Sequence, residues 1–263
     1  MIMVVAASAL HSPSAPAPVG IVVHGALLAY DGVRLFDNLS FEVAPGHIAC
    51  LLGPSGVGKS SLLRLIAGLT GAASGVVRGS DGVPLTGRVA YMDQRDLLLP
   101  WASALDNVLL GSRLRGETPD RARARDLLTA VGLADRMDAR PKALSGGQRQ
   151  RVALARTLAE DRPVILMDEP FSSLDALTRS RLQELAARLL VGKTVLLVTH
   201  DPLEALRLGD AIHVMAGRPV ELGPAMAPPG LTPRDPTEPH LVQLHRGILS
   251  TLRAADAATG GQP

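Results

Sequence analysis

The glycine-rich segment GPSGVGKSS, residues 53–61, constrains the fold of this 263-residue chain more than any other feature. It comes after a continuous apolar run, HIACLL at residues 47–52, which is typical of a strand buried on both faces. Apolar residues at helical spacing come after it: Leu62, Leu65, Ile66 and Leu69. The segment therefore predicts a strand, a tight loop and a helix, the unit that builds parallel α/β sheets.

Two more apolar runs are continuous, PVILM at residues 163–167 and TVLLV at residues 194–198, and a helical pattern at residues 177–190 separates them. We expect all three runs to be strands of a parallel sheet. Three other segments alternate in polarity or form short apolar runs between turn residues, which is typical of antiparallel sheet. They are residues 21–30, 35–43 and 76–92. The expected fold class is α/β, with a mixed, mainly parallel sheet core and an antiparallel β subdomain.

Residues 53–61, called the phosphate loop below, match GxxxxGK[ST] in the strand–loop–helix context that this motif requires. The glycines let backbone N–H groups surround a β-phosphate, Lys59 can neutralise the β and γ oxygens, and Ser60 can ligate magnesium. The helix that begins near Lys59 adds its positive end. The alternative is a glycine turn with a surface lysine. The predicted nucleotide-binding residues here are Gly53, Pro54, Ser55, Gly56, Val57, Gly58, Lys59, Ser60 and Ser61.

Chemistry-bearing side chains also follow the other two continuous runs, and ligands of parallel sheets bind beyond the carboxyl ends of the strands. Asp168 suits a magnesium shell, and Glu169 can act as the general base that polarises an attacking water. Two solvated carboxylates are the alternative. His200, after the third run, is a candidate partner for a γ-phosphate, although a lone histidine is usually structural.

A second glycine pair lies in LSGGQ, residues 144–148, called the signature segment below. Ser145 and Gln148 have the spacing of a capping box, which explains a helix start there. It does not explain Gly146 and Gly147, because each glycine costs a helix about 1 kcal/mol against alanine. Bare backbone at a helix N-terminus permits close approach of a phosphate, so this is a candidate second anion site. One chain cannot easily wrap both glycine sites around one γ-phosphate, whereas two copies arranged head to tail can.

Within residues 25–222 the motifs GPSGVGKSS, LSGGQ, VILMDEP, SSLD and LLVTH occur in the order of the ATP-binding cassette ATPases, and the chain resembles that family. The resemblance implies a P-loop NTPase fold of ABC type that binds ATP and Mg²⁺. It implies a dimer in which the signature segment of one copy closes on ATP held by the other.

The resemblance also assigns roles to single residues. Tyr30 is expected to stack on adenine, with a strand-packing tyrosine as the alternative. Gln94 is expected to sense both the magnesium and the attacking water, and Asp175 to contact the second copy. The catalytic set that results is Lys59, Gln94, Glu169 and His200, and the magnesium set is Ser60, Gln94 and Asp168.

The chain is expected to divide into a disordered leader at residues 1–19, an ATPase domain at 20–222, and a proline-rich linker with a C-terminal helix at 223–263. Residues 95–145 resemble the helical subdomain of the family, with a helix start at Thr118-Pro119. In transporters of the family this region accepts a helix from the membrane subunit. The only tryptophan, Trp101, is a candidate wall of that groove. Apolar residues at helical spacing predict the C-terminal helix: Leu241, Leu244, Ile248 and Leu252.

Composition narrows the choice of partners and compartment. A net charge of +2 and 2% aromatic residues argue against nucleic acid. The single cysteine, Cys50, sits in an apolar run, which fits a buried thiol in a reducing compartment. No apolar stretch reaches the 18 or more residues typical of a membrane span. Composition therefore predicts a cytoplasmic protein that is soluble or peripheral, and the family resemblance implies a place on the inner face of the cell membrane.

These observations favour an ATP-hydrolysing subunit that dimerises around two ATP–Mg²⁺ sites and drives a separate permease, served indirectly by a solute-binding protein. Two alternatives stay open: a soluble ATPase of the same fold without a permease, and a nucleotide-binding module that does not hydrolyse ATP. Glu169 beside Asp168 disfavours the second. The segments QRDLLLPWASALDNVLLG and THDPLEALRLGDAIHVMAGRP resemble importers of nitrate, sulfonate, taurine and thiamine-precursor pyrimidines. Of these solutes, the pyrimidines are the single choice that the sequence favours.

Overall fold

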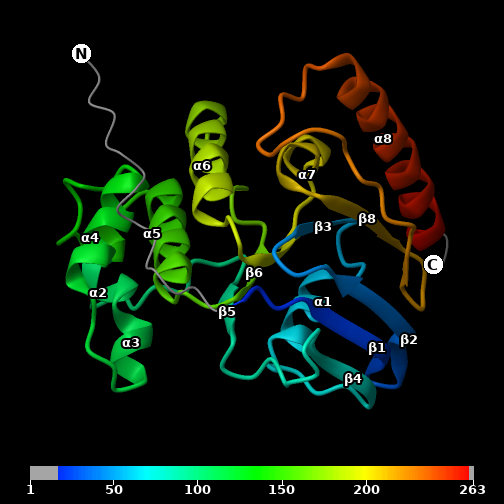
Figure 1. Ribbon diagram of the computed structural model, residues 1–263, viewed down its shortest axis with the longest axis horizontal. Helices are drawn as coiled ribbons and strands as arrows, with labels where there is room; N and C mark the ends of the chain where they lie inside the picture. The colour runs from blue at the N-terminus through cyan, green and yellow to red at the C-terminus, as the bar shows by residue number, and fades with distance from the viewer. Residues whose placement is uncertain (1–16, 261–263) are drawn as a thin grey trace.

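A computed structural model describes residues 17–260 of the chain. Most of the leader expected at residues 1–19 therefore lies outside the described residues, as does the end of the C-terminal tail. Within the described part, two sheets and eight α-helices form two lobes that meet at the edge of the larger sheet (Figure 1).

The larger sheet has six strands in the order β5-β6-β7-β3-β8-β9. The three continuous apolar runs form adjacent parallel strands in its centre, as predicted, and every residue of these strands is buried. The strands of this sheet are β3 (Ile48–Leu52), β5 (Val89–Met92), β6 (Val164–Asp168), β7 (Thr194–Val198), β8 (Ala211–Ala216) and β9 (Glu221–Leu222). Only β9 is antiparallel to its neighbour.

The smaller sheet is antiparallel and has the order β2-β1-β4. Its strands are β1 (Ile21–Tyr30), β2 (Val33–Val43) and β4 (Ser74–Gly79). The assignment of residues 76–92 to this sheet is wrong for their second half, because β5 pairs in parallel with β6. Ala90 and Met92 of β5 are buried in the core cluster that the larger sheet shares with the helices. Pairing with the larger sheet is therefore what buries these two side chains.

Helix α1 (Lys59–Ile66) lies between the two sheets (Figure 1). Its apolar side chains, among them Leu62 and Ile66, share one buried cluster with Phe36 of β2 and Leu196 of β7. The helix ends at Ile66, so Leu69, expected on the same face, is exposed beyond it. Sandwiching α1 between two sheets fixes the direction in which its N-terminus points.

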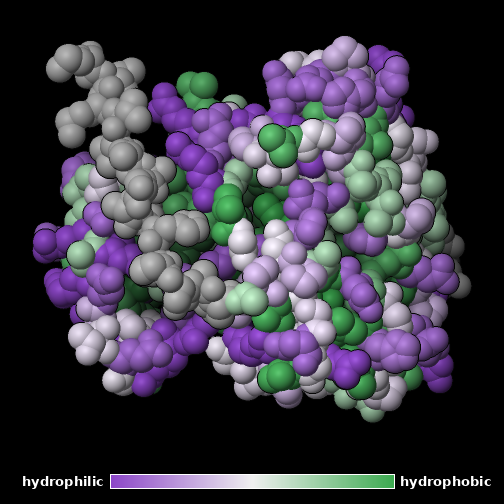
Figure 2. All heavy atoms as spheres, in the orientation of Figure 1, coloured by the Kyte–Doolittle hydropathy of each residue, from purple (hydrophilic) through white to green (hydrophobic). Residues whose placement is uncertain are grey.

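The second lobe, called the helical lobe below, contains α2 (Ala104–Val108), α3 (Leu110–Leu114), α4 (Arg121–Ala130) and α5 (Gly146–Ala159). It lies beside β5 and is covered by polar side chains on its outer side (Figure 2). Helix α4 does not start at Thr118-Pro119, because the side chain of Asp120 accepts the Arg123 N–H and caps the first turn. A side-chain cap at the N-terminus outweighs the proline signal that sequence analysis used.

Three more helices follow the signature segment along the chain: α6 (Ala176–Leu189), α7 (Pro202–Leu208) and α8 (Pro239–Gly260). Helix α8 lies against β8 and α7, and Leu241 and Ile248 are fully buried there. The linker before it is held by buried Arg234, which donates to the carbonyl oxygens of Leu206 and Gly209 at the end of α7. None of the helices in residues 17–260 combines the length and apolarity needed to cross a membrane.

Candidate functional site

The phosphate loop connects β3 to α1 and ends at Gly58, which caps the helix in the left-handed region with a φ of 111°. Only glycine adopts this conformation without strain, and a Cβ at this position would also come within 3.0 Å of Leu35. The loop therefore brings backbone N–H groups to the positive end of α1. This is the cradle that a phosphate group requires.

Lys59 is buried at the start of α1, and its ammonium group folds back onto the loop. Its Nζ donates to the carbonyl oxygens of Gly53 and Pro54, at 2.7 and 2.8 Å. Burial lowers the pKa of Lys59, while the carboxylates of Glu169 and Asp168 oppose that shift. These two hydrogen bonds hold the Lys59 ammonium group at the phosphate loop, near the carboxylates of Asp168 and Glu169. Bonds to phosphate oxygens can replace them.

Asp168 is the last residue of β6 and is almost fully buried. Burial raises the pKa of its carboxyl group, a hydrogen bond from the Ser60 hydroxyl lowers it, and the charges of Glu169 and Asp93 raise it. Ser60 and Asp168 thus present a hydroxyl and a carboxylate oxygen to each other beside the phosphate loop. Hard oxygen donors of this kind, with phosphate oxygens, are the set that Mg²⁺ prefers, so the residues fit the ion.

Glu169 and His200, called the Glu169–His200 pair below, come together beyond the ends of β6 and β7. Glu169 Oε2 lies 3.0 Å from His200 Nδ1, and the His200 side chain is 62% exposed. Glu169 has a φ of 49°, which is strained for a residue with a side chain, and its N–H donates to the Val198 carbonyl oxygen at 2.9 Å. The two side chains therefore meet just beyond the ends of β6 and β7.

Strand register explains why these groups meet. Val198 of β7 lies level with Leu51 of β3 on one side and with Asp168 of β6 on the other. Because the three strands are adjacent and parallel, whatever follows each of them emerges at the same edge of the sheet. The structure therefore places the phosphate loop, the two acids and His200 together.

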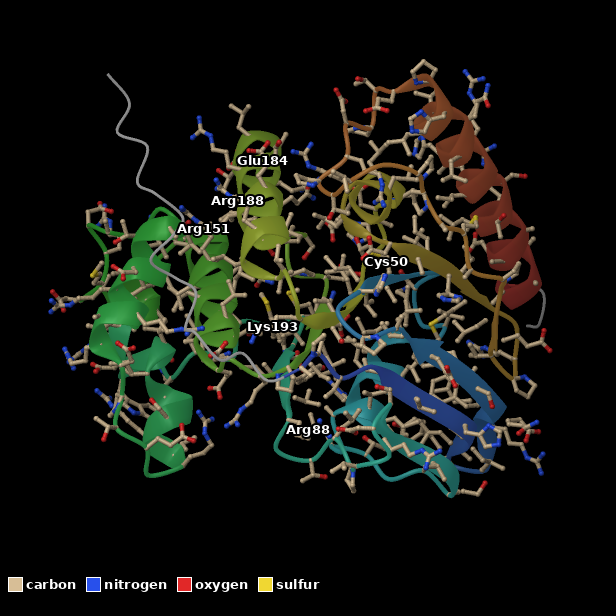
Figure 3. All side chains as sticks on the ribbon, viewed as in Figure 1. Cys50, Arg88, Arg151, Glu184, Arg188 and Lys193 are labelled. Carbon is tan, nitrogen blue, oxygen red and sulfur yellow. The ribbon has the colours of Figure 1, made fainter. Side chains whose placement is uncertain are left out.

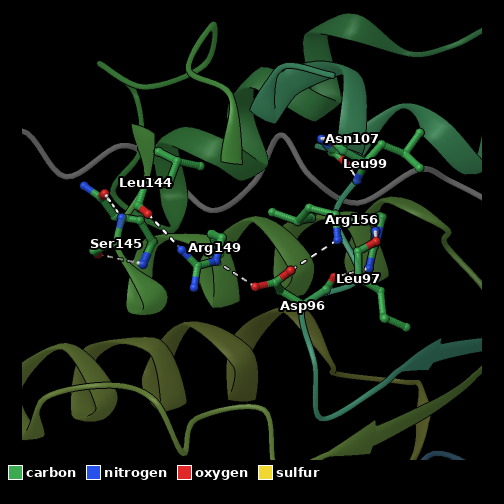
Figure 4. Close-up of polar contacts among 10 residues, drawn as sticks. Asp96, Leu97, Leu99, Asn107, Leu144, Ser145, Arg149 and Arg156 are labelled. Carbon is green, nitrogen blue, oxygen red and sulfur yellow. Dashed lines mark hydrogen bonds and ion pairs between the residues drawn. The ribbon is translucent and has the colours of Figure 1, made fainter. Parts of the chain in front are cut away.

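Gln94 lies two residues beyond β5 and faces the helical lobe. It lines a cavity of about 410 Å³ together with Gly146 of the signature segment and Ser173. The three residues that hold this wall in place were not anticipated from sequence. Arg149 Nε is 2.9 Å from Asp96 Oδ2, and Arg156 donates to the Asp96 carbonyl oxygen at 2.7 Å (Figure 4). The signal was available, because two arginines seven residues apart fall on one face of the predicted helix.

The signature segment forms the capping box that was predicted. Ser145 Oγ accepts the Gln148 N–H, and Gln148 Oε1 accepts the Ser145 N–H. A Cβ on Gly147 would lie 3.3 Å from the Ser173 carbonyl oxygen, so internal packing accounts for that glycine. A Cβ on Gly146 would meet nothing nearer than Arg149 Nη2, at 3.9 Å. Packing within one chain does not explain why Gly146 is bare.

Several predicted site residues stand apart from the phosphate loop. No hydrogen bond or ion pair in residues 17–260 joins that loop to Tyr30, Gln94, Asp175 or residues 145–148 of the signature segment. Tyr30 is exposed at the end of β1, and Asp175 caps α6 by accepting the Thr178 N–H at 3.0 Å. That bond, the largest cause, lowers the pKa of Asp175.

Comparison with known proteins adds three findings. Residues 36–172 match the sequence profile of a family described as "ABC transporter". An uncharacterized ABC transporter ATP-binding protein of Haemophilus influenzae is 44% identical over 86% of this chain and 95% of its own length. Proteins named aliphatic sulfonates import ATP-binding protein SsuB 1 are 45% identical in Rhodococcus jostii, over 87% of each chain, and 42% identical in Streptomyces avermitilis, over 96% and 94%.

Solved structures agree with these sequence matches. The dimeric post-hydrolysis state of the ATP-binding cassette MJ0796, bound to ADP and Pi, superposes with a TM-score of 0.72 at 30% identity. The match covers 80% of this chain and all of that one. A second dimeric structure of MJ0796, a bacterial ABC transporter cassette, gives the same TM-score at 29% identity.

Proposed function

The chain belongs to the ABC transporter family and is an ATPase, and from this premise we propose that it powers a membrane importer by clamping ATP between two copies of itself. One observation carries the proposal: the phosphate loop, Asp168 and the Glu169–His200 pair emerge at a single edge of the parallel sheet. This arrangement puts charge stabilisation, a hydroxyl for a metal and a general base around one phosphate position.

Each of these groups has a physical task in phosphoryl transfer, which depends on positioning and charge stabilisation. The loop N–H groups hold the β-phosphate, and Lys59 exchanges its carbonyl partners for phosphate oxygens. Ser60, Asp168 and Gln94 would hold Mg²⁺, which neutralises developing charge when bound. Glu169 accepts the proton of the attacking water, and His200 holds that carboxylate and contacts the γ-phosphate.

The second half of the site comes from a second copy. Gly146 is bare although nothing within its own chain requires it, which supports close approach of a partner's phosphate at the N-terminus of α5. The two MJ0796 structures, which are dimeric, support the same arrangement here. Tyr30 would stack on the adenine ring, and Asp175 would contact the partner while it caps α6.

The solute and the membrane partner are inferred from the named relatives. The SsuB proteins are named as aliphatic sulfonate import subunits, which supports sulfonates ahead of the pyrimidines that sequence analysis favoured. We place the chain on the inner face of the membrane, bound to a permease that a solute-binding protein serves. The remaining alternative is a cassette without a permease. Affinity capture from solubilised membranes decides between a permease-bound subunit and a cassette without a permease. Only the permease-bound subunit should bring down a multispanning protein.

Replacing Trp101 by glutamate is expected to separate transport from ATP hydrolysis. The Trp101 side chain is 69% exposed on the helical lobe, so a charge there leaves the fold intact but disrupts an apolar contact with a permease helix. Uptake of a labelled alkanesulfonate by cells should fall at least about tenfold, the effect of losing an interface hot spot. ATP hydrolysis by the purified chain should stay unchanged.

Leu231→Glu is the matched control for Trp101→Glu. Leu231 is even more exposed, but it lies in the linker before α8 and far along the chain from the helical lobe. Its replacement should leave uptake unchanged, and Trp101→Phe should preserve uptake. Normal uptake by Trp101→Glu would rule out Trp101 as a permease contact.

A further inference from the structure

Gln94 lies in a short segment, residues 93–98, called the Gln94 segment below, which leads from the end of β5 into the helical lobe. Two aspartates shape this segment, and each accepts the backbone N–H of the residue two positions further on, as in an Asx turn. The Oδ1 atoms of Asp93 and Asp96 accept these N–H groups at 3.1 and 3.2 Å. The two aspartates therefore bracket Gln94 along the chain.

The Gln94 side chain has no anchor of its own. It is exposed and lines the cavity of about 410 Å³ described above, and no hydrogen bond among the described residues holds it. Where its amide group lies therefore depends on the backbone of the Gln94 segment. The contacts of the two flanking aspartates decide how that backbone is held.

Asp93 holds the sheet side of the segment, and holds it weakly. Its Oδ2 accepts the Tyr91 hydroxyl of β5 at 3.3 Å and a hydrogen bond from Arg64 Nη2 at 3.4 Å. Arg64 belongs to α1, the helix that begins at the phosphate loop, but its side chain is 47% exposed. Long hydrogen bonds and exposed ion pairs stabilise a structure little. Asp93 alone therefore holds Gln94 loosely.

Asp96 holds the other side of the segment more firmly, on the helical lobe. Its Oδ2 lies 2.9 Å from Arg149 Nε in a partly buried pair, and its carbonyl oxygen accepts a hydrogen bond from Arg156 Nη2 at 2.7 Å (Figure 4). Arg156 Nη1 also donates to the Leu97 carbonyl oxygen at 2.9 Å, and Leu97 has a strained φ of 45°. Hydrogen bonds with charged donors are stronger than neutral ones, so these contacts keep a strained backbone in place.

The same contacts reach the signature segment. Arg149 Nη1 donates to the carbonyl oxygen of Leu144, the first residue of the signature segment, at 3.0 Å, while its Nε is bonded to Asp96 (Figure 4). Both arginines belong to α5, the helix that starts in that segment. One guanidinium group therefore links the segment that carries Gln94 to the segment proposed to close on the partner's ATP.

We propose that Asp96 is a positioning residue for Gln94, because it fastens the Gln94 segment to the signature segment of the same chain. The inference rests on the proposed roles of Gln94 at Mg²⁺ and of the signature segment at the partner's ATP. Gln94 would serve the ATP held by its own phosphate loop, whereas the signature segment would serve the other ATP. The bond between Asp96 and Arg149 thus connects the two ATP sites of the dimer within one chain.

The test measures the affinity of the full chain for a fluorescent ATP analogue, once with Mg²⁺ and once with EDTA. The Glu169→Gln background prevents hydrolysis during the titration. Asp96→Ala should weaken the affinity with Mg²⁺ about tenfold, the effect of removing a group that orients a metal ligand. The affinity in EDTA should stay within about twofold, because the phosphate loop and the contacts of Lys59 are unchanged.

A double-mutant cycle separates positioning from support of the fold. Gln94→Ala should by itself weaken the affinity with Mg²⁺. Adding Asp96→Ala should then cause no further loss beyond about twofold, because Asp96 acts only through Gln94. If Asp96→Ala does not fold, Arg149→Gln breaks the same ion pair from the other side, and its cycle with Gln94→Ala decides in the same way.

Asp81→Ala is the matched control. Asp81 also accepts an N–H two residues further on, from Val83, and it is paired with Arg88 at 2.6 Å. Arg88 directly precedes β5, at the opposite end of that strand from Gln94 (Figure 3). The control therefore removes the same turn and the same kind of ion pair away from Gln94. Both affinities should stay within about twofold of the parent.

Equal losses of affinity with Mg²⁺ and in EDTA would overturn the proposal, because they would show support of the fold and not of Gln94. An unchanged affinity with Mg²⁺ in Asp96→Ala or in Gln94→Ala would overturn it as well, and so would an additive loss in the double variant. Failure of the proposed hydrolytic site would be distinct, because Glu169→Gln would then retain hydrolysis whatever Asp96 does.

Discussion

Replacing Glu169 by glutamine is expected to lower kcat for ATP hydrolysis by about 10² to 10⁴, the range for loss of a general base. The amide keeps the shape of the side chain but cannot accept the proton of the attacking water. Backbone strain is unchanged, because glutamate and glutamine meet the same restriction at a φ of 49°. ATP affinity should stay within about threefold of the wild type, since the phosphate loop and Lys59 hold the nucleotide.

Single-turnover phosphate release measures the chemical step of Glu169→Gln, and equilibrium titration with a fluorescent ATP analogue measures binding. Glu221→Gln on β9 is the control, because that exposed glutamate lies outside the site. Hydrolysis by Glu169→Gln at near the wild-type rate would show that another group accepts the proton.

Replacing Gly146 by aspartate should also lower turnover strongly, by a different route. Gly146 is the first residue of α5, where a carboxylate stabilises the helix through its dipole. A side chain also fits within the chain, because the nearest atom to a Cβ is 3.9 Å away. The same negative charge would repel the phosphate of ATP held by the partner. We expect kcat to fall by at least about 10², as for removal of preorganised charge stabilisation.

The aspartate variant should melt at or above the wild-type temperature and should bind ATP normally, which separates a dimer defect from a folding defect. Sedimentation in the Glu169→Gln background reports assembly directly: ATP should produce a dimer in that variant and a monomer in the double variant. Gly146→Ala is the control that adds size without charge. If the double variant still forms dimers with ATP, the N-terminus of α5 does not contact the ATP that the partner holds.

Local sequence patterns anticipated most of the local backbone structure around the candidate site. The continuous runs identified β3, β6 and β7, because a strand buried on both faces needs apolar residues at every position. The glycine positions and Lys59 predicted the loop, because only glycine adopts the left-handed conformation of Gly58 without strain. The capping box at Ser145 was also readable, since its two partners are three residues apart.

Other features depend on contacts between distant segments, and these the linear pattern does not contain. The pairing of β5 with β6 depends on which sheet offers burial to Ala90 and Met92. The approach of Glu169 to His200 depends on strand register and on a strained φ, and the link between Asp96 and Arg149 joins residues 53 positions apart.

A buried carboxyl group, Glu204 of α7, shows the division most clearly. In the sequence it is one of several acids near the start of a helix, where a solvated carboxylate would be ordinary. Its environment is created only when α6, α7 and the linker close around it, which removes water and raises its pKa. Residue type and spacing determined the backbone of the phosphate loop and of the signature segment, because backbone conformation is a local property. Tertiary packing decided which side chains meet, because burial, charge and distance arise only between elements.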